Sequence, residues 1–81
     1  MPFVNVYVPE GSLTLEKRRL MIEKITDAVV EAEGLPHVRP GVYVLVNDVP
    51  DGGWGIGGRA YDRAALGELV AQAAVKAAAA S

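Results

Sequence analysis

The sequence predicts an α/β (α+β) fold built on one β-α-β unit, with two parallel strands, a short glycine-rich β-hairpin and an added C-terminal helix. Three observations predict it: two segments alternate with the period of a strand, the segment between them has helical spacing, and a glycine-rich stretch precedes an alanine-rich one. The chain has 81 residues, 51% of them hydrophobic, which leaves room for one domain. We expect a single domain over residues 1–81, with a core over 2–60 and a C-terminal helical extension over 61–81.

Periodicity and stop signals define the first strand and the first helix. Residues 3–8 place valine at every second position, and residues 9–12 end the strand. Thr14 is a candidate N-cap for a helix over residues 14–33, in which apolar residues recur at helical spacing. Gly34 then supplies a left-handed stop.

A second strand is predicted over residues 41–49, which alternate again. A connection of this length that contains a helix joins parallel strands with a right-handed crossover, and we expect the helix to cover the valine-lined face of the sheet. The other face carries large side chains with no second helix to cover them: Phe3, Tyr7, Tyr43 and Leu45. A two-stranded sheet is marginally stable alone, and a chain without cysteine has no disulfide to reinforce it. We therefore expect other subunits or the C-terminal segment to bury part of this face.

Residues 50–58 are too rich in glycine for a helix, which predicts a turn or small hairpin that carries one large side chain, Trp54. Residues 53–58 also match the dinucleotide-binding pattern G-x-G-x-x-G. That motif needs a larger sheet and an acidic residue about 20 positions later, so we assign these glycines to close backbone packing. Residues 61–80 have strong helix propensity and a modest apolar face, which predicts a packing helix.

Charge and composition exclude several classes of function. The formal net charge of −2 lacks the basic excess of nucleic-acid-binding proteins, so we expect no nucleic-acid partner. With no cysteine and one histidine, His37, a single chain has no thiolate nucleophile and no multi-histidine metal site, and we expect neither metal nor cofactor. No signal-peptide pattern is present and no stretch approaches the ~18 apolar residues of a membrane span. We expect no membrane partner and a cytoplasmic location.

Pro2 carries the sharpest chemical signal. Removal of Met1 would leave Pro2 as a free secondary amine at the start of the first strand. Desolvation disfavours the protonated form of such an amine and brings its pKa toward neutrality, where a general base works best. A retained Met1 would acylate the nitrogen and remove its basicity. Proline is common at position two, so ordinary terminal chemistry is the alternative.

Several of these features occur together in one known family. Met1-Pro2 opens the first strand, Glu10-Gly11 follows its end, and an aromatic-Gly-Ile-Gly-Gly motif at residues 54–58 follows the second strand. Over residues 2–60 the chain resembles the tautomerase superfamily, specifically the short 4-oxalocrotonate tautomerase type.

The resemblance implies a cofactor-free tautomerase or isomerase that moves a proton in a small enol or 2-oxo acid. It implies that Pro2 is the general base and that Trp54 is an apolar wall of the pocket. It also implies a homo-oligomer, a hexamer built as a trimer of dimers with its sites at subunit interfaces. A smaller assembly or a hetero-oligomer stays open, because the C-terminal extension can alter assembly.

Two positions depart from the family's pattern. Ser12 stands where an arginine usually follows the Glu-Gly pair, and Tyr43 stands where an arginine usually lies on the second strand. In the family those arginines bind substrate carboxylates. Arg39 and Arg59 are candidate replacements, although a solvated surface cation is the simpler description of each. Ser12 and Tyr43 are also candidate substrate contacts, with turn formation and interface packing as their respective alternatives.

Two other functions stay open. A related proline-dependent hydratase, dehalogenase or decarboxylase would share the base and differ in how water or the leaving group is held. A non-catalytic or partner-dependent subunit would rely on a second chain for the missing arginines. Ser12 and Tyr43 favour that second possibility, whereas Pro2 and Trp54 oppose it.

Overall fold

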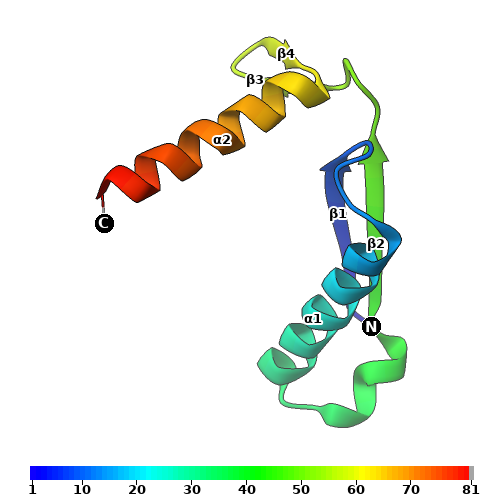
Figure 1. Cartoon of the computed structure of the whole chain (residues 1–81). Helices are drawn as coiled ribbons and strands as arrows, with labels where there is room; N and C mark the ends of the chain where they lie inside the picture. Colours follow the sequence, from blue (N-terminus) through cyan, green and yellow to red (C-terminus); the bar gives the residue numbers. More distant parts are fainter. Residues whose placement is uncertain (81) are drawn as a thin grey trace.

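A computed structural model describes residues 1–80; Ser81, the last residue of the expected extension, lies outside the described residues. The order of elements along the chain is β1 (Phe3–Pro9), α1 (Leu15–Glu33), a 3-10 helix η1 (Pro36–Gly41), β2 (Tyr43–Val49), β3 (Trp54–Ile56), β4 (Arg59–Tyr61) and α2 (Arg63–Ala80). Figure 1 shows α1 alongside the β1–β2 sheet and α2 extending away from it. Among residues 1–80, no helix is both long and apolar enough to cross a membrane.

The two long strands pair in parallel, as expected from the sequence. The register runs from Phe3 opposite Tyr43 to Pro9 opposite Val49. The N–H of Tyr43 also donates to the Pro2 carbonyl at 3.0 Å, which extends the pairing by one residue. The strand begins at Tyr43 and not at position 41, because the 3-10 helix, which the sequence analysis did not predict, continues through Gly41.

Helix α1 begins and ends at the expected residues. The Thr14 hydroxyl oxygen accepts a hydrogen bond from the Lys17 N–H at 3.2 Å, and Gly34 adopts φ 69°. The Gly34 N–H donates to the carbonyls of Val30 and Glu31, which are two of the groups a helix end leaves without a partner. These local signals therefore fix both ends of the crossover helix.

The two faces of the sheet differ in exposure. Helix α1 packs against β2, and the valines of both strands are half-buried or buried, with Val8 9% exposed. The opposite face leaves four large side chains 41–60% exposed: Phe3, Tyr7, Tyr43 and Leu45. The expected unpartnered face is therefore present on the single chain.

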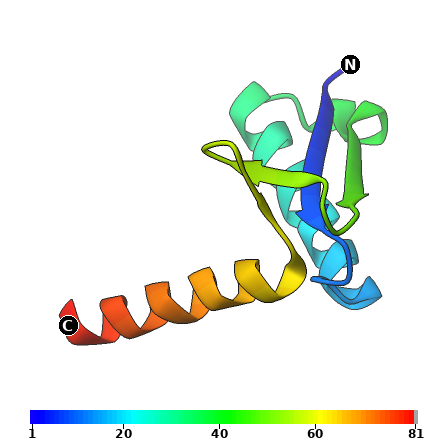
Figure 2. The ribbon, with the colours of Figure 1, turned by 90° about the horizontal axis from the view of Figure 1, so that it is seen from above.

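The hairpin extends three residues beyond the predicted range of 50–58. Strands β3 and β4 are antiparallel with Trp54 opposite Tyr61, so Tyr61 belongs to a strand and the expectation that it begins the helix was wrong. Asp62 caps α2, because its Oδ1 accepts from the Ala65 N–H at 2.8 Å. Figure 2 shows α2 leaving the hairpin and running clear of the sheet, and residues 71–80 are all exposed.

Candidate active site

Pro2 lies at the end of the sheet where both parallel strands begin. It is half-buried, and its carbonyl is held by the Tyr43 N–H. The rings of Phe3 and Tyr43 stack with centroids 6.1 Å apart, so Tyr43 faces an aromatic neighbour on the exposed side of the sheet. With Met1 attached, the Pro2 nitrogen is a tertiary amide and has no basicity. The Met1 side chain lies over Gly41, with its Cε 2.7 Å from where a Cβ on that glycine would stand.

Arg39 lies at this same end, in the 3-10 helix that precedes β2, but its guanidinium is turned to α1. It donates a hydrogen bond to Asp27 in an ion pair whose two side chains are each about half exposed. An exposed pair of this kind contributes at most about 1 kcal/mol. The structure therefore places Arg39 in a surface ion pair on the helix side of the sheet.

Ser12 lies at the opposite end of the sheet, in the turn that follows β1. Its hydroxyl donates to the Pro9 carbonyl at 2.6 Å, and its N–H donates to the same oxygen at 3.1 Å. Its side chain therefore closes the turn, which is the structural role that the sequence offered as the alternative to substrate contact.

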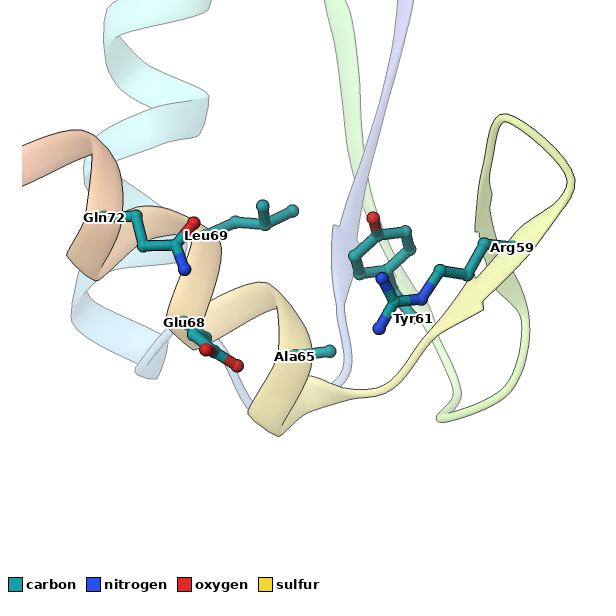
Figure 3. A pocket seen from close by; sticks show the side chains of 6 residues that line it. All are labelled: Arg59, Tyr61, Ala65, Glu68, Leu69 and Gln72. Atoms are coloured by element: carbon teal, nitrogen blue, oxygen red, sulfur yellow. The ribbon is translucent and has the colours of Figure 1, made fainter.

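Trp54 and Arg59 lie beyond the end of β2, on the two strands of the hairpin. Trp54 is half-buried, and the Arg59 guanidinium lies 4.9 Å from the centre of the Tyr61 ring. Figure 3 shows Arg59 reaching over Tyr61 toward a hollow of about 170 Å³ whose other side is formed by α2. The α2 side of the hollow consists of Ala65, Glu68, Leu69 and Gln72.

The predicted site residues thus form two groups at opposite ends of β1. Pro2, Tyr43 and Arg39 lie at its start, and Ser12 with the hairpin residues lies past its end. Seven strand residues at about 3.3 Å each separate the two ends of the sheet by about 20 Å. A single chain therefore does not bring Pro2 next to Trp54 or Arg59.

Arg63, the first residue of α2, was not among the site residues predicted from the sequence. Its side chain lies against Gly11 in the turn that precedes Ser12, and both residues line one cleft. The missing arginine at position 12 was a reason to search the chain for another guanidinium. No local rule connects positions 11 and 63, however, so only the folded chain shows the contact.

Comparisons with known proteins agree with this fold. The family model described as "Tautomerase enzyme" matches residues 2–63. The 2-hydroxymuconate tautomerase of Comamonas testosteroni is 45% identical over 58 residues, which cover 72% of this chain and 87% of that protein. The 2-hydroxymuconate tautomerase of Pseudomonas putida is 41% identical with the same coverage of both chains.

A solved structure gives the same result. One of the 4-oxalocrotonate tautomerase isozymes from Methylibium petroleiphilum superposes with a TM-score of 0.67 and 45% identity, over 82% of this chain and 98% of that one. The sequence resemblance to the short tautomerases is thereby confirmed, as is the fold. This chain belongs to the tautomerase superfamily, and it is an isomerase of the 4-oxalocrotonate tautomerase-like type.

Proposed function

We propose that this chain is a cofactor-free tautomerase in which Pro2, freed by removal of Met1, is the general base for proton transfer in a small enol or 2-oxo acid. The observation that carries the proposal is the placement of Pro2, which is half-buried and directly precedes the first strand of a tautomerase fold, with its carbonyl bonded to the Tyr43 N–H. Relatives named 2-hydroxymuconate tautomerase make an unsaturated enol acid the first substrate to test.

The proposed chemistry needs one base and one polarising environment. The neutral Pro2 nitrogen takes the enol O–H proton, the oxygen becomes a carbonyl, and the resulting ammonium returns a proton to a carbon of the conjugated chain. The substrate loses and gains one proton, so no oxidant, water or cofactor takes part. Removal of the Met1 acyl group is the condition for this step, because an amide nitrogen cannot accept the proton.

The proposed site is completed by a second copy of the chain. Trp54 and Arg59 follow the end of β2, whereas the Pro2 of their own chain precedes the start of β1, at the other end of the sheet. The exposed face formed by Phe3, Tyr7, Tyr43 and Leu45 offers the apolar surface for association. We propose a homo-oligomer, a hexamer as a trimer of dimers, in which Trp54 walls the pocket around the Pro2 of a neighbouring subunit.

The test is an assay of ketonisation with 2-hydroxymuconate and with phenylenolpyruvate, on protein whose intact mass shows that Met1 is absent. Pro2→Ala should lower kcat at least hundredfold, because the positioned base supplies a factor of about 10² to 10⁴. Pro50→Ala, at an exposed proline outside the hydrogen-bonded strands, is the matched control and should keep full activity. A Pro2→Ala variant with wild-type kcat would overturn the proposed base.

A partner-dependent subunit is the second candidate, and the arginines missing at Ser12 and Tyr43 are the observation that favours it. Native mass spectrometry distinguishes a self-sufficient enzyme from a partner-dependent subunit. A stable homohexamer that is active alone supports the self-sufficient enzyme, whereas a chain that assembles and turns over only with a second tautomerase-like chain supports the partner model.

A further inference from the structure

We propose that Arg63 supplies the carboxylate-binding guanidinium of the pocket at the end of β1, and that it makes the site selective for dicarboxylates over monocarboxylates. The inference rests on the proposed function, since it names the residue that binds the far carboxylate of the acid while the Pro2 of a neighbouring subunit acts on the enol. Arg63 is the first residue of α2 and the last residue that the tautomerase family model matches.

The Arg63 side chain occupies the space directly above Gly11. A Cβ built on Gly11 would overlap Nη1 of Arg63 and stand 3.4 Å from its Cζ and 3.6 Å from its Cδ. Gly11 also has φ +76°, a conformation that residues with a side chain rarely adopt. The turn at the end of β1 is thus shaped so that a guanidinium from another element lies on its backbone.

The start of α2 holds the backbone of Arg63 in place. Its N–H donates to Oδ1 of Asp51 at 3.2 Å, and the adjacent Asp62 caps the helix through the Ala65 N–H at 2.8 Å. Both contacts use backbone donors of the first helical turn. Neither of these contacts involves the guanidinium of Arg63.

Arg63 differs from Arg39 and Arg59, the two candidate replacements for the arginines that this chain lacks at positions 12 and 43. Arg39 pairs with Asp27, and Arg59 lies over the Tyr61 ring. Within residues 1–80, the Arg63 guanidinium makes no ion pair and no hydrogen bond. Its N–H groups are therefore available to a carboxylate in the bidentate arrangement that arginine favours.

A cleft of about 420 Å³ lies beside this guanidinium, within the size range of small-molecule sites. Its walls combine Arg63 with Pro9, Leu66 and Val70. Ser12 also lines the cleft, but its hydroxyl donates a hydrogen bond to the Pro9 carbonyl. An apolar groove with one cation fits a short unsaturated chain that ends in a carboxylate. The absence of a side chain at Gly11 leaves this space open for Arg63.

The experiment compares two inert six-carbon acids that differ only at one end. The probes are trans,trans-muconate, with two carboxylates, and sorbate, which has a methyl group in place of the second. Calorimetric titration of the Met1-free oligomer should show muconate binding at least tenfold more tightly, because a charge-assisted bidentate pair contributes about a factor of ten or more. Arg63→Ala should remove this preference.

Two further variants complete the design. Arg19→Ala removes an exposed arginine from α1 and should keep the muconate preference. Ser12→Arg in the Arg63→Ala background should restore it, since it returns a guanidinium to the same turn. The rescue also separates a lost carboxylate contact from a misfolded α2.

Binding and catalysis report on different proposals. If Pro2→Ala is inactive while Arg63→Ala keeps the muconate preference, the proton-transfer function stands and the Arg63 inference is overturned. If the wild-type protein prefers muconate but has no tautomerase activity, and Arg63→Ala removes the preference, the Arg63 site stands and the proposed reaction fails. A wild-type protein that binds muconate and sorbate equally overturns the inference directly.

Discussion

The guanidinium of Arg63 lies against the backbone of Gly11, in the space that a side chain at position 11 would need. This contact joins the first turn of α2 to the turn that ends β1. Figure 2 shows the same proximity, with the start of α2 beside the loop between β1 and α1. The C-terminal helix thereby contributes to the end of the sheet that carries Ser12.

Gly11→Ala should therefore cost both stability and carboxylate binding. The φ of +76° adds strain of about 1–2 kcal/mol for a residue with a Cβ, and the new methyl group displaces Arg63. We expect lower stability in urea unfolding together with loss of the muconate preference in calorimetry.

Gly34→Ala is the matched control, since Gly34 has φ +69° and nothing within 4 Å of its Cβ position. It should show similar destabilisation with the muconate preference intact. Equal loss of the preference in both variants would show that strain alone, and not displacement of Arg63, is responsible.

Thr14→Ala should lower the free energy of unfolding by about 1 kcal/mol, because the Lys17 N–H loses the hydroxyl that caps α1. Thr14→Ser keeps the acceptor and should stay close to wild type. Urea unfolding followed by circular dichroism at one fixed protein concentration measures both, since association adds to apparent stability. A Thr14→Ala variant as stable as Thr14→Ser would show that the cap contributes nothing measurable.

The parts of this fold that the sequence predicts are those with local or periodic causes. Alternating valines predict the strands and the buried face, and Thr14 with Gly34 predicts the ends of α1. Tyr61 was assigned to the wrong element because the alanine-rich segment has strong helix propensity, whereas its pairing with Trp54 across the hairpin decides its conformation.

The candidate site was less accessible to sequence reasoning. The chemistry of Pro2 and the motif around Trp54 identified both residues as candidates from the sequence. Arg39 was also a candidate, but the sequence did not predict its ion pair with Asp27. The contact of Arg63 with Gly11 depends on where α2 leaves the hairpin, which no periodicity encodes. Contacts between segments distant in sequence need the folded chain.

Leu45→Asp should dissociate the proposed oligomer. Leu45 is 41% exposed on the single chain, beside Tyr43 and Tyr7 on the face proposed to pack between subunits. A carboxylate buried there without a partner costs several kcal/mol, which is enough to shift the assembly to smaller species. Sedimentation velocity measures the shift. Lys24→Asp, an exposed site on α1 with a larger change of charge, should leave the assembly intact. An unchanged Leu45→Asp oligomer would place the interface elsewhere.

Mixing two inactive variants tests whether the site is shared between subunits. Pro2→Ala lacks the base and Trp54→Ala lacks the proposed apolar wall, and the two residues belong to opposite ends of the sheet within a chain. If each site combines Pro2 of one subunit with Trp54 of another, co-refolded mixtures should regain activity, at about one quarter of the wild-type sites in a random equimolar mixture. Each variant refolded alone is the control. A mixture no more active than its components would mean that the two residues serve the site from one chain, or that Trp54 lies outside it.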